Sequence, residues 1–413
     1  MTYASVNIER PRILFAWEFG KNLGHLVRLV EIFKSIRARD GTVIWAIPPQ
    51  YAKHPILPED AQLIYNTQSF TSPILDRNTI NKADSNVKFH SFADVLLGLG
   101  FSDTQTLQTD ITYWLRIFEK VRPTSVLCDY APFALLAASS LGIPTFQITN
   151  GFDAPPLAFP MFDSTVRGPY IELANARKVA QLDDRITSVG RALGMPRLNL
   201  SSFMSWPKLV IDGIPETDPY GSRTSVRYIG PFIQSSITNI PNWPEEKEPD
   251  KNKRIFAYLR GSYAKQVLET LKELPATTYC LWPDATSEVL DRFNGPRMRV
   301  TQKMQNLPRI FTRTDSVISY GSSGFLNATL LAGKPHLILP TDREKLMFSR
   351  RIERLGAGIS LERVNQPNLR HQIQRILDNE EFATSAKKIS SRYSDSYFNQ
   401  QKCAFFDELS HCQ

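Results

Sequence analysis

Short apolar runs alternate with helix-like patterns from the beginning of the chain. Residues 13–17 form a continuous apolar run, which is typical of a buried strand in a parallel sheet. Apolar positions spaced mostly three and four apart then predict a helix over residues 26–36, and residues 42–47 predict a second strand. This order of strand, helix and strand predicts a parallel α/β domain near the start of the chain.

The same order recurs further along. Residues 125–128 and 145–148 predict two strands with a helix between them. A new series opens with a strand at 255–259, and residues 316–318 and 337–339 predict later strands, again separated by a helix. The pattern therefore predicts two α/β halves, each of which opens with a strand, a glycine-bearing turn and a helix.

Less regular segments lie between and after these series. Residues 237–254 are rich in Pro, Glu and Lys and poor in apolar residues, which predicts a linker or a long surface loop. Residues 174–193 predict one long helix, and residues 383–409 predict a helix near the end of the chain. A length of 413 residues also favours two domains.

The composition is that of a globular protein. Hydrophobic residues make up 42% of the chain and charged residues 22%, which argues against wholesale disorder. The first ten residues lack the pattern of a signal peptide, and no apolar stretch approaches the roughly 18 residues of a transmembrane helix. We therefore expect a cytoplasmic protein and leave peripheral contact with the inner face of the membrane open. The cysteines lack CxxC spacing, which argues against a disulfide scaffold and a zinc site: Cys128, Cys280, Cys403 and Cys412.

The charge balance is basic. The chain has 49 Lys and Arg against 41 Asp and Glu, for a formal net charge of +8. Such a balance favours nucleic acid, an acidic membrane surface or a phosphorylated small molecule as partner. We interpret the pairs Arg350-Arg351 and Lys387-Lys388 as solvated helix faces, because no nucleic-acid-binding signature accompanies them.

The first glycine-bearing turn, residues 20–25, ends in His25 at the predicted start of a helix. It matches neither GxGxxG nor a P-loop, so it gives little support for nucleotide binding. Helix N-terminal N–H groups disfavour a charged imidazole, and a neutral histidine in a cleft is a candidate general base. The competing interpretation is a histidine that is hydrogen-bonded at a helix cap.

The second turn, residues 320–324, reads Tyr-Gly-Ser-Ser-Gly between a predicted strand and a helix. Glycine allows a close backbone approach, and a helix N-terminus presents N–H groups to an anion. The turn is therefore a candidate diphosphate site, and an ordinary strand-to-helix turn is the alternative.

Two further groups follow predicted strands. Asp129 ends the strand at 125–128, at the edge where α/β folds build their sites, and could pair with an imidazole or cap the next helix. Residues 260–262, Arg-Gly-Ser, could add a cation and a hydroxyl to a phosphate site or form a plain turn. The chain has no D-x-D triplet, so a carboxylate-held Mg²⁺ or Mn²⁺ is not expected.

The second half resembles the donor-binding region of GT-B-fold UDP-glycosyltransferases, and the chain looks like a bacterial relative of the macrolide and plant enzymes. Residues 317–340 resemble the family signature, in which HGGxGT is followed by a helix, G-x-P and a strand ending in Pro. The match continues without a gap to Glu344-Lys345, where the family has an acidic residue and Gln. Shorter matches are found at residues 228–231, 261–262 and 355–358.

The first half resembles the opening of the same family. Gly24-His25, followed by apolar residues and then by Gly41 and Val43, is similar to its G-H…RGH-x-V segment. Residues 126–129 and 141–144 match its D…LGIP segment. The resemblance implies a GT-B fold, with two Rossmann-like domains facing across a cleft. It implies an acceptor-binding domain over 1–226, a donor-binding domain over 227–382, and a helix in 383–413 that returns to the first domain.

The resemblance implies an inverting, metal-independent glycosyltransferase. It moves a sugar from a nucleotide diphosphate sugar, with UDP-sugar expected before dTDP-sugar, to a hydroxyl of a small-molecule or lipid-linked acceptor. No cofactor is expected besides this co-substrate. His25 aligns with the base and Asp129 with its partner. The donor-binding positions are Arg260, Ser262, Met304, Gln305, Tyr320, Gly321, Ser322, Ser323, Gly324, Glu344 and Lys345.

The chain departs from the family pattern inside the donor signature. Tyr320 stands where the family has His, Phe325 where it has Thr, and Lys345 where it has Gln. Ser322 replaces the second Gly, and Ala328 stands where many members have Glu. Two alternatives stay open: a nucleotide-sugar epimerase or hydrolase of this fold, and a non-catalytic nucleotide-sugar-binding protein. The first would need carboxylates near the sugar, for which Glu18 and Asp129 are candidates.

Overall fold

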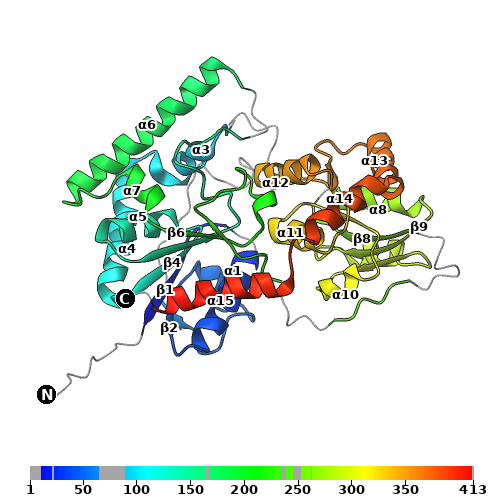
Figure 1. Cartoon of the computed structure of the whole chain (residues 1–413), viewed down its shortest axis with the longest axis horizontal. Helices are drawn as coiled ribbons and strands as arrows, with labels where there is room; N and C mark the ends of the chain where they lie inside the picture. Colours follow the sequence, from blue (N-terminus) through cyan, green and yellow to red (C-terminus); the bar gives the residue numbers. More distant parts are fainter. Residues whose placement is uncertain are drawn as a thin grey trace. The chain divides into compact units, whose positions relative to one another are not determined.

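A computed structural model describes residues 11–20, 23–64, 89–162, 167–233, 239–244, 253–261 and 263–411 of the chain (Figure 1). The chain forms two compact units. The first unit consists of Met1–Asp212, Arg223–Phe232 and Asn399–Gln413, and the second of Gly213–Ser222 and Ile233–Phe398. The predicted domain boundaries, after residues 226 and 382, therefore differ from those of the structure. The chain enters the second unit at Gly213, returns briefly to the first over Arg223–Phe232, and returns to it again at Asn399.

The first unit is built on a seven-stranded sheet in the order β3-β2-β1-β4-β5-β6-β7. Every pairing between its named strands is parallel. The strands predicted near the start of the chain and at 125–128 and 145–148 are confirmed. The strands are β1 (Arg12–Trp17), β2 (Thr42–Ala46), β3 (Gln62–Leu63), β4 (Ser125–Asp129), β5 (Thr145–Thr149), β6 (Lys208–Ile211) and β7 (Arg227–Tyr228).

Helices connect these strands, as parallel pairing requires. The predicted helix over 174–193 is confirmed as α6, which begins five residues earlier, at Pro169. Proline is favoured in the first turn of a helix because its missing N–H has no partner there in any case. The helices are α1 (Leu23–Arg37), α3 (Phe92–Leu96), α4 (Thr104–Val121), α5 (Pro132–Leu141), α6 (Pro169–Ala192) and α7 (Leu200–Ser205). Short helical turns are η1 (Pro49–Tyr51) and η3 (Leu97–Phe101).

The core of the first unit includes the end of the chain. Phe405 and Leu409 are fully buried in the same apolar cluster as Phe15 and Leu29, which come from β1 and α1. The aromatic ring of Phe405 lies 5.8 Å from that of Phe146 on β5. The last part of the C-terminal helix is therefore packed into this unit by apolar burial.

The second unit has a six-stranded parallel sheet in the order β10-β9-β8-β11-β12-β13. Its strands are β8 (Lys253–Tyr258), β9 (Ala276–Leu281), β10 (Met298–Thr301), β11 (Ser316–Ser319), β12 (His336–Ile338) and β13 (Gly358–Ser360). Its helices are α8 (Ala264–Lys272), α9 (Ser287–Phe293), α10 (Leu307–Phe311), α11 (Ser323–Leu331), α12 (Arg343–Arg354), α13 (Gln366–Asp378) and α14 (Glu380–Ser390), with the short turn η4 (Pro215–Thr217).

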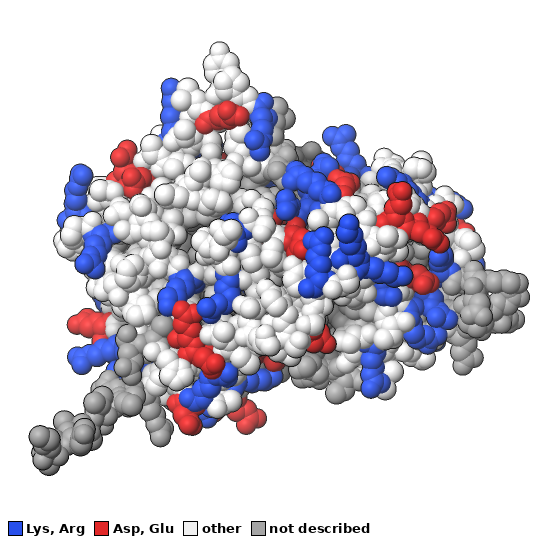
Figure 2. Space-filling view, in the orientation of Figure 1, with Lys and Arg blue, Asp and Glu red and all other residues white. Residues whose placement is uncertain are grey.

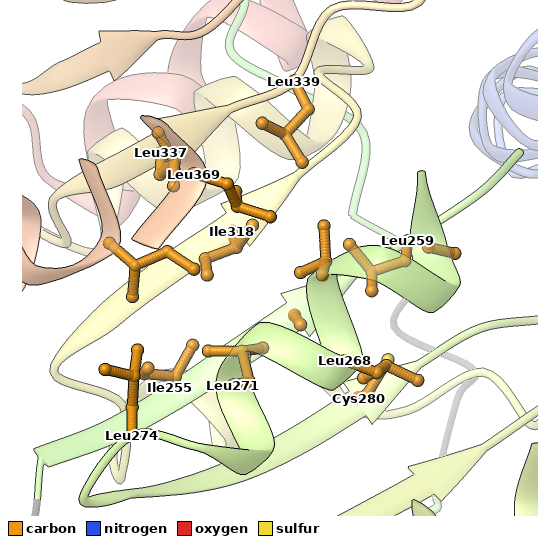
Figure 3. Close-up of a cluster of buried hydrophobic side chains, with 14 of the residues drawn as sticks. Ile255, Leu259, Leu268, Leu271, Leu274, Cys280, Ile318, Leu337, Leu339 and Leu369 are labelled. Carbon is orange, nitrogen blue, oxygen red and sulfur yellow. The ribbon is translucent and has the colours of Figure 1, made fainter. Parts of the chain in front are cut away.

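Both faces of this second sheet are covered, as a continuous apolar strand predicts. Along β8, Ile255 and Ala257 belong to one apolar cluster, whereas Phe256 and Tyr258 belong to another. This alternation follows from the two-residue period of a strand. Figure 3 shows the first cluster, in which Ile255 lies among leucines from neighbouring strands and helices.

Three details differ from the sequence-based predictions. The helix predicted over 383–409 is two helices, α14 and then α15 (Asp395–His411), which begins in the second unit and ends in the first. The segment 213–222 packs with the second unit because Asn327 Oδ1 accepts from Ile214 N–H at 3.2 Å and from Thr217 Oγ1 at 2.7 Å. Most of the predicted loop over 237–254 lies outside the described residues.

Candidate active site

The candidate catalytic groups of the first unit gather at the carboxyl edge of its sheet. Asp129 is the last residue of β4 and lies in register with Trp17, the last residue of β1. Thr149 ends β5 and is in register with Ile211, the last residue of β6. Because all these strands are parallel, the residues that follow them meet at one edge, where α/β folds bind ligands.

His25 lies in the first turn of α1 and is hydrogen-bonded to Asp129. Its Nδ1 is 2.7 Å from Asp129 Oδ1, and its ring stacks 5.3 Å from that of Trp17. Among the described residues, no hydrogen bond to Nε2 is found, and the side chain keeps 18% of its exposure. The sequence prediction that these two residues pair is therefore confirmed as geometry, and its alternative, a helix-cap histidine, does not describe this contact.

Gly20 is required by the position of that ring. Its φ is +88°, and a Cβ added there would lie 2.5 Å from His25 Nε2. A side chain would therefore push the ring away, besides the strain of a left-handed backbone. Tyr130, directly after Asp129, also has a positive φ of 47°, which is uncommon for a residue with a side chain and often occurs at functional sites.

Asp129 is fully buried and ionised. Burial alone raises the pKa of a carboxyl group, but the charges of Arg28 and His25 and their hydrogen bonds outweigh burial and hold the pKa of Asp129 below its usual value. Asp129 can therefore fix the imidazole so that Nδ1–H donates to the carboxylate. Nε2 is then the basic atom.

Sequence reasoning missed Arg28 and Asp212. Arg28 Nε donates to Asp129 Oδ2 at 3.0 Å, and its Nη1 lies 2.9 Å from Asp212 Oδ2. Two signals could have found them: Arg28 lies one helical turn after His25, and Asp212 directly follows β6, as Asp129 ends β4.

Glu18 does not serve the alternative that paired it with Asp129. Its two oxygens accept from the backbone N–H groups of Phe133 at 3.1 Å and Ala134 at 2.7 Å, at the start of α5. Burial raises the pKa of Glu18 well above its usual value, although these hydrogen bonds oppose the rise. Its oxygens thus cap a helix, and nothing in this geometry favours an epimerase or hydrolase.

In the second unit, the glycine-bearing turn joins β11 to α11 as predicted. Gly321 has a φ of +88°, and a Cβ added there would lie 2.8 Å from Ile338 Cγ2. Ser322 is the N-cap of α11 but makes no side-chain capping bond, whereas Ser323 and Gly324 form its first turn. The turn therefore directs a helix N-terminus, with its partial positive charge, at the carboxyl edge of the second sheet.

Two cations lie beside Tyr320 in this turn. Lys345 Nζ is 5.8 Å from the centre of the Tyr320 ring and is paired with Asp342. Burial lowers the pKa of Lys345, but Asp342 and Glu344 more than offset this effect, so its ammonium stays charged. Arg260 follows β8, interacts electrostatically with Tyr320, and lies 3.6 Å from Asp284 Oδ2.

His336 is a residue of this region that the sequence reasoning did not single out. It is buried at the start of β12, and its Nε2 is 2.8 Å from Ser319 Oγ. Ser319 Oγ also accepts from the backbone N–H of Gly321 at 3.1 Å, so its own proton is available to His336. This chain of hydrogen bonds holds the turn in place from beneath.

The remaining donor-binding predictions are placed as follows. Gln305 is buried, with Nε2 donating to the Lys303 carbonyl at 2.8 Å, whereas Met304 is 41% exposed. Glu344 is half-buried in the first turn of α12. Ser262 lies outside the described residues. Their roles toward a donor stay predictions.

Within the described residues, no group of three His, Cys, Asp or Glu could hold a metal ion. No helix in that part of the chain is long and apolar enough to cross a membrane.

Comparisons with known proteins agree with this architecture, although no protein-family model matches the chain. The chain is 25% identical to a PGL/p-HBAD biosynthesis glycosyltransferase of Mycobacterium tuberculosis, over 94% of this chain and 90% of that protein. The solved structure of CalG4, the calicheamicin glycosyltransferase, matches with a TM-score of 0.67 and 14% identity, covering 97% of this chain and 98% of its own. Glycosyltransferase VinC in complex with dTDP matches with a TM-score of 0.64 and 14% identity, over the same shares.

These similarities confirm two predictions made from the sequence. The fold is GT-B, with two parallel-sheet α/β domains. The class of enzyme is a glycosyltransferase.

Proposed function

We propose that this protein is an inverting, metal-independent glycosyltransferase that moves a sugar from a nucleotide diphosphate sugar to an acceptor hydroxyl. In this proposal His25 is the general base and Asp129 orients it. The second unit binds the diphosphate. The observation that supports the proposal most directly is the His25–Asp129 pair, in which Nδ1 is occupied at 2.7 Å and Nε2 is left for an acceptor.

The chemical step is a direct displacement. His25 Nε2 takes the proton of the acceptor hydroxyl while the oxygen attacks the anomeric carbon of the sugar. The bond between this carbon and the diphosphate breaks, and its electron pair leaves with the nucleotide diphosphate. A single displacement inverts the anomeric configuration. A general base placed in this way typically contributes about 10²–10⁴-fold to the rate.

The charges of the second unit suit the departing diphosphate. The N-terminus of α11 offers backbone N–H groups, and Lys345 and Arg260 add two cations beside Tyr320. A tyrosine hydroxyl can donate to phosphate, as a histidine N–H does. These groups are the reason why we propose a reaction that needs no metal.

For the donor we propose UDP-sugar first and dTDP-sugar second. VinC is described with dTDP bound, which keeps the second candidate in view. For the acceptor we propose a small molecule or a lipid-linked alcohol. A thermal-shift screen of UDP-, dTDP- and GDP-sugars tests donor binding, because a ligand that binds only the folded state raises its stability. If none of these sugars raised the unfolding temperature, the result would favour a protein that does not use these donors.

We expect His25→Ala to lower glycosyl transfer by at least ~10²-fold, because it removes the base. Transfer is measured as release of UDP or dTDP with 2-naphthol and 2-phenylethanol as acceptors, and the anomeric configuration of the product is read by NMR. His371→Ala, an exposed histidine on α13, is the matched control and keeps the wild-type rate. An unchanged rate in folded His25→Ala protein would remove His25 from the mechanism.

A further inference from the structure

Arg28 is a buried cation that two carboxylates share. Its side chain is 6% exposed and comes from α1, one turn after His25. Nε and Nη2 both donate to Asp129, which binds the guanidinium with both oxygens, and Nη1 lies 2.9 Å from Asp212 Oδ2. Such two-point pairing holds a carboxylate in one orientation more firmly than a single hydrogen bond does.

The same Asp129 oxygen serves both Arg28 and His25. Oδ1 accepts from Arg28 Nη2 and is 2.7 Å from His25 Nδ1, while Nη2 itself is 3.2 Å from Nδ1. A guanidinium nitrogen can only donate, so Nη2 and Nδ1–H both donate to lone pairs of Oδ1. The positive guanidinium therefore weakens the electrostatic attraction between the Asp129 carboxylate and the imidazole.

The negative charge of Asp212 partly neutralises the positive charge of Arg28. Burial raises the pKa of Asp212 to about 6, because the field of Arg28 only partly offsets burial and Asp129 adds to the rise. Among the described residues, Asp212 Oδ1 has no hydrogen-bond partner. The ion pair of Asp212 is with Arg28, and its charge also acts on His25.

The other charged groups around this cluster are Asp153 and Lys402. Asp153 follows β5, interacts with Asp129, Arg28 and His25, and has a pKa raised mainly by burial. Lys402, in the part of α15 that belongs to the first unit, interacts with Asp212 and Glu31, and burial lowers its pKa. Neither group forms an ion pair with Arg28 or His25, so within the described part of the chain Arg28 is the cation in direct contact with the His25–Asp129 pair.

We propose that Arg28 is a positioning residue of the candidate active site. It orients Asp129 toward His25 and weakens the pull of that carboxylate on the protonated imidazole, and Asp212 in turn moderates Arg28. The inference rests on the proposed function only where it concerns catalysis, because the control of the His25 ring by Arg28 is a property of the folded protein alone. Its catalytic consequence is a base that is held in one orientation by a carboxylate whose charge is partly neutralised by Arg28.

The experiment follows the ring protons of His25 by NMR as the pH is changed, in the full-length protein without substrate. The chain has six histidines, so the signal is assigned by its loss in His25→Ala. We expect Arg28→Met to move the midpoint of this titration to higher pH by about one unit or more, because the opposing cation is gone. We expect Asp212→Asn to move it to lower pH, because Arg28 loses a counter-charge and His25 loses the direct attraction of Asp212, while the amide oxygen can still accept the hydrogen bond of Arg28.

Arg37→Met is the matched control, since Arg37 lies on the same helix, is exposed, and pairs with Asp60 at 2.9 Å. It leaves the midpoint unchanged. Asp212→Asn is the milder of the two test variants and keeps the experiment decisive if Arg28→Met does not fold. A midpoint that stays at the wild-type pH in folded Asp212→Asn, or that moves upward, overturns the proposal.

Activity separates this proposal from the proposed function. With UDP-glucose and 2-phenylethanol we expect Arg28→Met to lower kcat by about 10- to 100-fold, a part of the general-base contribution, with little change in the KM of the donor. If His25→Ala keeps the wild-type rate, the assignment of the base fails even when the titration midpoints move as expected. If His25→Ala is inactive and the midpoints do not move, the role of Arg28 alone is wrong.

Discussion

At the scale of single residues, the two site histidines have opposite environments. His25 is partly exposed and bound to a carboxylate, whereas His336 is 2% exposed and bound to a hydroxyl. Burial lowers the pKa of His336 to about 3, so this side chain stays neutral in the folded protein at ordinary pH. The residue type alone predicts neither of these two environments. The pattern of the sequence marked His25 through its place at a helix start but gave no sign of His336.

The neutral His336 predicts a dependence of stability on pH. The unfolded chain protonates this residue near pH 6.5 and the folded protein near pH 3, so stability is complete above pH 6.5 and falls as the pH drops toward 3. From pH 7 to pH 5 this residue accounts for a loss of about 2 kcal/mol in the free energy of unfolding.

Urea denaturation at several pH values checks this dependence. His336→Gln, which can still bond Ser319, is expected to lose less stability between pH 7 and pH 5 than the wild type does. His371→Gln, at an exposed position, is expected to follow the wild type. Equal slopes for wild type and His336→Gln would show that His336 is protonated equally in both states.

At the scale of elements, the apolar pattern predicted the first strands of each half but not β3, β6, β7, β10, β13 or the helix α4. The predicted C-terminal helix is broken between α14 and α15, and the chain passes from the second unit to the first within α15. The pair Arg350-Arg351 was interpreted as a solvated helix face, but both side chains have protein partners. Arg350 pairs with Glu353, and Arg351 Nε donates to the Glu216 carbonyl at 3.2 Å. Helical periodicity indicates which face is polar but does not identify its partners.

The turn between β11 and α11 predicts opposite effects for its two glycines. Gly321→Ala places a side chain at a φ of +88° and against Ile338, so we expect the free energy of unfolding to fall by at least about 1 kcal/mol. Gly324→Ala adds a methyl group with no atom within 4 Å, in the first turn of a helix, and is expected to be neutral or stabilising by up to about 1 kcal/mol. Chemical denaturation of both variants measures the difference, and an equal loss in both would contradict the geometry.

At the scale of the whole molecule, the net charge of +8 exceeds what one diphosphate requires. On the face drawn in Figure 2, Lys and Arg side chains are most concentrated over the second unit, where α12 and α14 lie in Figure 1. Lys387 and Lys388 are exposed on α14, in agreement with the prediction of a solvated helix face. The positive charge is therefore spread over the surface as well as placed beside Tyr320.

Fixed protein cations in place of a metal lead to a prediction for the intact enzyme. We expect that excess EDTA leaves the rate of UDP release unchanged, because the N-terminus of α11, Arg260 and Lys345 stabilise the departing diphosphate. The matched variant Lys345→Met is expected to slow the reaction whether or not EDTA is present. A loss of rate in EDTA that Mg²⁺ restores would contradict metal independence.

The sequence by itself determined the alternation of elements, the two α/β halves and the places where Asp129 and the Gly321 turn follow their strands. These features are encoded locally, because strand and helix periods and glycine positions lie within a few residues of one another. Only the tertiary structure decided that Arg28 joins Asp129 to Asp212, since the first of these partners lies 101 residues from Arg28 along the chain. Which distant side chains share a buried edge depends on the order of strands in the sheet, and the local pattern of a chain does not specify that order.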